Sequence, residues 1–280
     1  MIQDIPNAES FRDAGIEYLN KVWENSVQLL FRDDMDESER EPVLTHTQSN
    51  SNLALLHQGV DFLLKSRLAD ISPYLLLVGR SNHWPKSVST DISFSDFRII
   101  DSHDLVKAVN IVSKDRLPAY FGDWHKAIRN ARNRAIHTVD SNQYADSIEL
   151  IRLVLEASEF LFEPKQWLRI RRDFLHENDL SQNNHEPEIS EAYLLGCLQR
   201  EFLNAIDNLS LDDVSRHFDF NPKKDRHICQ YCLEIREREY FFELKNEEKY
   251  YLATAYWINE DRNDAYCLFC EEARIDETHP

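Results

Sequence analysis

Apolar residues recur at helical spacing along most of the chain, and this periodicity constrains the fold more than any other feature of the sequence. Within the segment 9–31, for example, Leu19, Val22 and Trp23 fall on one side of a helix. Glycine, which favours turns, occurs only five times in 280 residues. The sequence therefore predicts a mainly α fold.

Further helices are expected over 101–112, 119–138, 142–162 and 188–209. Another helix is expected to begin at Ser51 or Asn52, either of which is a suitable N-cap, and to be broken just before Pro73. The acidic stretch 33–41 is expected to be a solvated loop. We predict three parts: a helical domain at 1–165, a helical connector at 166–225, and a C-terminal α+β extension at 226–280.

No apolar run has the length that a membrane span requires, and the N-terminus lacks a basic segment followed by an apolar stretch. We therefore expect a cytoplasmic protein without a membrane partner. The five cysteines of such a protein are kept reduced, which favours metal binding over disulfides.

The net charge of −18 opposes nucleic-acid binding, because phosphate affinity depends on lysine and arginine. The charge is uneven, however. Acids gather at 33–41, whereas the segment 116–134 holds five basic residues and only Asp123 as an acid. A local basic site on an acidic protein is therefore compatible with the composition.

The helix expected at 119–138 carries the most informative polar residues. At 3.6 residues per turn, its apolar stripe comprises Trp124, Ile128, Ala131 and Ala135. A second, polar stripe comprises Arg129, Asn133 and His137, with Arg132 at the edge between the two. A histidine, an asparagine and arginines are thus expected to converge beside the buried face of this helix.

These residue types suit the cleavage of RNA without a catalytic metal, because the ribose 2′-OH is itself the nucleophile. Histidine titrates near neutral pH and can move the proton. Arginine presents a planar set of donors that matches phosphate oxygens, and asparagine can orient either group. The hypothesis assigns these roles to His137, Arg132 and Asn133, with Lys126, Arg129 and Arg134 as further RNA contacts.

The run from Arg132 through Asn133 to His137 matches the R-N-x-x-x-H form of the motif of HEPN ribonucleases, and the chain resembles that family over about 9–162. The resemblance implies a HEPN-type helical bundle that dimerises to bring two motifs together. It also implies that Asp61, on the second helix, is the acid of the site. HEPN ribonucleases occur among toxins and phage-defence effectors, which is the role the resemblance implies here.

Two other interpretations remain open. The arginines can form a solvated basic face, with His137 near the helix C-terminus, where cations are favourable in any helix. Alternatively, the domain keeps the HEPN fold as a catalytically inactive adaptor, because such domains also serve as binding scaffolds.

The C-terminal extension contains two C-x-x-C pairs separated by a 34-residue insert. The pairs comprise Cys229, Cys232, Cys267 and Cys270. Four thiolates close a tetrahedral Zn²⁺ site with no open position, so we predict a structural zinc. Aromatic and branched residues at 240–244 and 249–258 are β-prone and predict a zinc-ribbon-like module.

Reduced cysteine pairs in a core, or a redox dithiol, are the alternatives to zinc at these four cysteines. Neither the H-x-E pattern of zinc deaminases nor the H-E-x-x-H pattern of zinc proteases occurs. The module is rich in glutamate, which disfavours phosphate binding and favours a regulatory protein partner, although a zinc-ribbon nucleic-acid reader is a further, weaker alternative. Cys197 stands alone on an apolar helix face, where it is expected to pack in the core.

Overall fold

The computed structural model describes residues 1–30, 45–79, 84–85, 91–137, 145–182, 190–221, 223–239, 251–262, 264–270 and 273–275. The chain is mainly helical, as predicted, with two small two-stranded sheets among these residues. The expected loop at 33–41 and the first β-prone segment at 240–244 lie outside them. None of the described helices is long and apolar enough to cross a membrane.

The chain divides into two compact units. Unit 1 comprises Met1–Asn25 and Pro42–Phe162, and unit 2 comprises Ser26–Glu41 and Glu163–Pro280. Within unit 1, the helices are α1 (Ala8–Leu30, whose last residues belong to unit 2), α2 (His46–Ile71), α3 (Ser102–Val112), α4 (Phe121–His137) and α5 (Ser147–Leu161). Short 3-10 turns occupy Pro73–Leu76 and Phe94–Asp96, and β1 (Ile2–Gln3) pairs in parallel with β2 (Ile92–Ser93).

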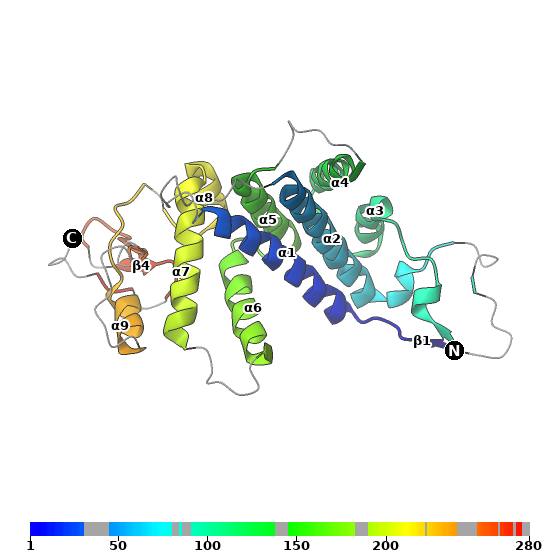
Figure 1. The fold of residues 1–280 in the computed structure, drawn as a ribbon, viewed down its shortest axis with the longest axis horizontal. Coiled ribbons are helices and arrows are strands. Elements are labelled where there is room, and N and C mark those ends of the chain that lie inside the picture. The colour runs from blue at the N-terminus through cyan, green and yellow to red at the C-terminus, as the bar shows by residue number, and fades with distance from the viewer. Residues whose placement is uncertain are drawn as a thin grey trace. The chain divides into compact units, whose positions relative to one another are not determined.

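Helix α2 is the central element of unit 1 and packs against α3, α4 and α5 (Figure 1). It begins earlier than predicted, because Thr45 and not Ser51 or Asn52 is the N-cap. Thr45 and Gln48 form a reciprocal capping box, which satisfies backbone donors at the first turn. The helix ends at Ile71, directly before Ser72 and Pro73, which confirms the predicted break.

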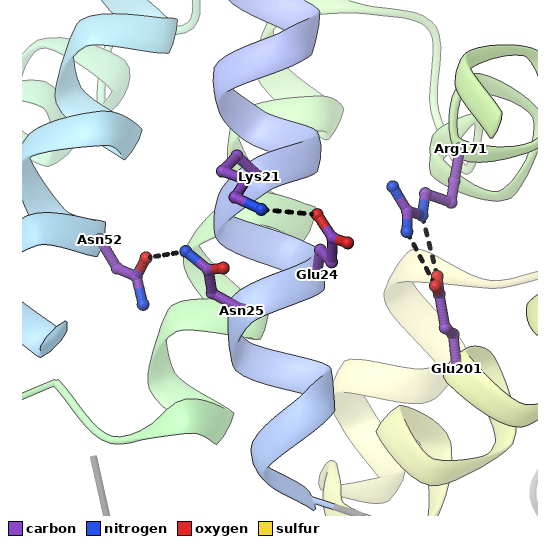
Figure 2. Close-up of polar contacts among 6 residues, drawn as sticks. All are labelled: Lys21, Glu24, Asn25, Asn52, Arg171 and Glu201. Carbon is purple, nitrogen blue, oxygen red and sulfur yellow. Dashed lines mark hydrogen bonds and ion pairs between the residues drawn. The ribbon is translucent and has the colours of Figure 1, made fainter. Parts of the chain in front are cut away.

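Two glycines allow α1 and α2 to approach closely. A Cβ atom on Gly59 would lie 3.1 Å from the carbonyl oxygen of Gly15, and one on Gly15 would lie 2.7 Å from Cγ of Leu63. Further along the same pair of helices, the side-chain amide of Asn25 donates to Oδ1 of Asn52 over 2.8 Å (Figure 2). Together these contacts fix the register of α1 on α2.

Unit 2 contains α6 (Trp167–Gln182), α7 (Glu191–Asn208), α8 (Leu211–His217), α9 (Gln230–Glu239) and the antiparallel hairpin of β3 (Ala255–Trp257) and β4 (Ala265–Cys267). Helix α7 packs against α6 and α9. The sequence predicted α7 and a helical connector at 166–225, which contains α6 and α8, but it assigned no bounds to these two helices and did not predict α9.

A buried ion pair joins α6 to α7. The guanidinium of Arg171 donates two hydrogen bonds, of 2.9 and 2.8 Å, to the two carboxylate oxygens of Glu201 (Figure 2). The Arg171 side chain is only 2% exposed, and its pairing with the Glu201 carboxylate offsets the free-energy cost of removing its charge from water. A charged residue of α6 thus occupies a buried position, where an apolar residue would be expected. For this reason the apolar residues alone do not show the helical repeat of α6.

Candidate functional site

Helix α4 places the central motif residues next to each other. The side chains of Arg129, Arg132 and Asn133 are half-buried, whereas Lys126 and Arg134 are exposed. Nη1 of Arg132 donates to Oδ1 of Asn133 over 2.9 Å. The Asn133 amide therefore helps to orient the Arg132 guanidinium.

His137 is the last residue of α4, and its side chain lies outside the described residues. Its predicted role as the proton-moving group stays a prediction.

The inward face of α4 differs from the predicted one. Phe121, His125 and Ile128 are buried, whereas Trp124 is half-buried and donates from Nε1 to Glu156 over 2.6 Å. The apolar pattern predicts Trp124 as part of the buried stripe, together with Ile128, which is buried as predicted. The helix is rotated from that position because a polar residue, His125, points inward and finds a partner there.

That partner is Asp61 on α2, which the resemblance implied as the acid of the site. Nε2 of His125 lies 2.9 Å from Oδ1 of Asp61, and Oγ of Ser102 donates to the same oxygen over 3.0 Å. His57, one helical turn before Asp61, has Nε2 3.0 Å from Oγ of Ser102. The exposed fractions of His57, Asp61 and His125 are 5%, 6% and 3%.

We call these four residues the buried His-Asp cluster: His57, Asp61, Ser102 and His125. It joins α2, the first residue of α3, and α4 within unit 1. Burial lowers the pKa of His57, the carboxylate of Asp61 opposes that shift, and His125, Arg132 and Arg129 add to it. The two arginines therefore interact electrostatically with the cluster.

No sequence pattern predicts His57, Ser102 or His125 as residues of a site. Two local signals were present: His57 and Asp61 are four residues apart on one helix, and His125 lies one turn before Arg129. Neither spacing shows that the two helices meet, so the cluster appears only in three dimensions.

In unit 2 the four predicted ligand cysteines come together. Their sulfur atoms all lie within 4.8 Å of one another. Sγ of Cys229 lies 3.5 Å from that of Cys270, and Sγ of Cys232 lies 3.7 Å from that of Cys267. All four are free thiols, because these separations are far longer than a disulfide bond of about 2.05 Å. The arrangement is compatible with a metal ion at the centre.

The surrounding backbone holds the first cysteine pair against the hairpin. Cys229 donates its backbone N–H to the carbonyl of Leu252, and the following residues begin helix α9, which carries Cys232. The second pair starts at the end of β4 with Cys267, whose sulfur contacts Thr254 Oγ1 over 3.1 Å. In the described part of the predicted strand at 249–258, which begins at residue 251, the strand covers Ala255–Trp257, and the first pair leads into a helix.

The cysteines influence one another's protonation. The hydrogen bond from Cys232 lowers the pKa of Cys229, and the same contact raises the pKa of Cys232. The hydrogen bond with Cys229 likewise raises the pKa of Cys270. By contrast, Cys197 is a half-buried thiol away from this group, and burial raises its pKa, which makes it a poor nucleophile.

No known protein family matches the chain. Comparison with curated proteins and with solved structures gives no match either. We therefore infer the function from the geometry of these two sites and from the sequence motif.

Proposed function

We propose that the protein is an RNA endonuclease of the HEPN type, which cleaves without a metal ion at its catalytic site. The observation that supports this most is the pairing of Arg132 with Asn133, half-buried on α4 beside the buried His-Asp cluster. A solvated basic face would leave these arginines exposed, as Arg134 is. The half-buried position favours a specific anionic ligand instead.

In the proposed reaction, the ribose 2′-oxygen forms a bond to the adjacent phosphorus as the bond from phosphorus to the 5′-oxygen breaks. His137 removes the 2′-OH proton, Arg132 stabilises the charge that develops on the phosphate oxygens, and the departing 5′-oxygen takes up a proton from water. Asn133 orients Arg132, while Arg129, Lys126 and Arg134 contact the strand. The products are a 2′,3′-cyclic phosphate and a 5′-hydroxyl.

Asp61 has a positioning role in this proposal. Its carboxylate is buried and accepts hydrogen bonds from Ser102 and His125, so it has no surface to offer a substrate. Through His125 it anchors the face of α4 that continues, one and two turns later, with Arg129 and Arg132.

A homodimer, which would place two copies of the motif in one cleft, is part of the proposal. So is a cellular role as a toxin or phage-defence effector under the control of a protein partner. These elements come from the family resemblance.

We further propose that the four cysteines bind a structural Zn²⁺. In a tetrahedral site with Zn–S bonds of about 2.3 Å, neighbouring sulfurs stand about 3.8 Å apart. The separations of 3.5 and 3.7 Å fit that geometry. The ligands leave no open position, so the ion would stabilise unit 2 and take no part in cleavage.

Expression of the protein and its variants in growing cells tests the proposed activity. We expect the wild type to arrest growth and fragment cellular RNA, and His137→Ala to do neither. His103→Ala is the matched control, because His103 is an exposed histidine on α3 in the same unit. It should remain as toxic as the wild type.

Equal toxicity of the His137→Ala variant would contradict the assignment. Absence of RNA fragmentation by any form, together with a stable bound protein, would instead favour the inactive adaptor.

A further inference from the structure

We propose that His57, Asp61 and His125 form a second Zn²⁺ site, in unit 1, that is separate from the four cysteines. The inference does not depend on the proposed nuclease activity. The three side chains come from two helices, α2 and α4, and their ligand atoms all lie within 4.8 Å of one another. Two imidazoles and a carboxylate are a common donor set for zinc.

Burial distinguishes this group from an ordinary surface cluster. Each of the three residues is less than a tenth exposed, and the two imidazole rings stack with centroids 5.5 Å apart. Desolvating an ionised carboxylate such as Asp61 is costly unless a nearby positive charge or hydrogen bonds compensate for it. Two hydrogen bonds, from Ser102 and His125, compensate one oxygen of Asp61.

Counting the protons shows that His57 has none to donate to Oδ2, the other carboxylate oxygen of Asp61. Ser102 has one hydroxyl proton and donates it to Asp61, so Nε2 of His57 must donate to Ser102. With its proton on Nε2, the neutral tautomer of His57 has a lone pair on Nδ1. That atom lies 3.8 Å from Oδ2 of Asp61, so this tautomer places two lone pairs near each other inside the protein.

A cation between these two atoms resolves the conflict. Ligand atoms about 2.0–2.1 Å from a tetrahedral Zn²⁺ stand about 3.3 Å apart, so the gap of 3.8 Å between Nδ1 and Oδ2 needs little adjustment. Nε2 of His125 would supply the third ligand in place of its hydrogen bond to Asp61.

Ser102 has the position of an outer partner in such a site. Histidines that bind metals through one ring nitrogen usually donate the other N–H to a fixed oxygen, which orients the ring. The contact of His57 with Ser102 Oγ has this form.

The nearby Arg129 and Arg132 act against a cation, whereas the carboxylate of Asp61, with Oδ2 3.8 Å from Nδ1 of His57, acts for it. Both arginines are partly exposed, so water screens them. The buried ion would fasten α2 to α4 and would lie out of reach of a substrate.

Metal analysis of the purified full-length protein, dialysed against zinc and then against metal-free buffer, tests the site. We expect about two zinc ions per chain, of which a mercurial thiol reagent releases about one. The zinc that remains should be lost in His57→Asn and retained in His103→Ala. A wild-type protein that holds about one zinc, all of it released by the thiol reagent, would overturn the proposal.

Cobalt substitution of the wild type gives a second measurement that does not depend on whether a variant folds. After the thiol reagent, the remaining cobalt should show visible bands of a tetrahedral ion without thiolate-to-metal charge transfer. If every visible band disappears together with the thiolate-to-metal bands, the buried His-Asp cluster binds no metal. A proton on His57 would then lie between His57 and Asp61 in its place.

Discussion

His125 on α4 lies 2.9 Å, through Nε2, from Oδ1 of Asp61 on α2, although 64 residues separate the two in the chain. The contact is buried and connects the central helix of unit 1 to the helix that carries Arg132 and Asn133. It therefore makes the position of the proposed catalytic residues depend on the core.

Replacing His125 with alanine should destabilise unit 1. The substitution removes a donor from a buried carboxylate, which costs roughly 1–3 kcal/mol, and the charge of Asp61 favours the upper end of that range. Thermal or urea unfolding measures the effect. His103→Ala, at an exposed position, should change stability by less than about 0.5 kcal/mol. Equal stability of the two variants would contradict the role given to Asp61.

Adding a methyl group at Gly59 should separate α1 from α2. In Gly59→Ala the new Cβ would lie 3.1 Å from both Gly15 O and Tyr18 Cβ, and such overpacking typically costs about 1–3 kcal/mol. Gly122→Ala is the control, because its Cβ would meet its nearest neighbour at 3.9 Å. That change should be neutral or stabilise α4 by up to about 1 kcal/mol, since alanine is the better helix former. If urea unfolding showed Gly122→Ala to be less stable than Gly59→Ala, the result would contradict the close approach of α1 and α2 at Gly59.

The two ion pairs of Figure 2 should differ sharply in their contribution to stability. Removing one member of a buried pair leaves an uncompensated charge, so Arg171→Met should cost about 3–5 kcal/mol. Lys21 and Glu24 form an exposed pair, and Lys21→Met should cost about 0–1 kcal/mol. A loss of less than 1 kcal/mol in Arg171→Met would show that Glu201 finds another partner.

Removing the ligands of the four-cysteine site should affect unit 2 selectively. In Cys232→Ser, hydrogen–deuterium exchange should accelerate in α9 and the β3–β4 hairpin, because their packing depends on the bound ion. Exchange in α2 should remain as in the wild type. Unchanged protection of α9 after loss of the zinc would mean that the cysteines pack without a metal.

Helices with a regular apolar stripe could be predicted from the sequence, and those with buried polar groups could not. Helices α3, α5 and α7 follow their apolar periodicity and begin at capping residues such as Asp146 and Ser190. Helix α6 buries Arg171, whose partner Glu201 comes from another helix. A buried charge of this kind appears as surface in any pattern based on hydrophobicity.

The same distinction applies to the two sites. The four cysteines could be predicted because C-x-x-C spacing is local and its chemistry is specific. The buried His-Asp cluster could not, because it is assembled from α2, α3 and α4, and single histidines have many possible roles. The predicted orientation of α4 was incorrect for the same reason. The apolar pattern does not assign His125 to the buried face, but its hydrogen bond to Asp61 allows it to be buried there.

The chemistry of the RNA fragments tests the central claim most directly. Total cellular RNA is incubated in EDTA with the purified wild type, with Arg132→Ala, or with Arg116→Ala, an exposed arginine outside α4. We predict that the wild type and Arg116→Ala produce fragments ending in a 2′,3′-cyclic phosphate and that Arg132→Ala slows their formation at least about 100-fold. Fragments of the same kind formed equally fast by Arg132→Ala, or no fragments from the wild type, would contradict the account.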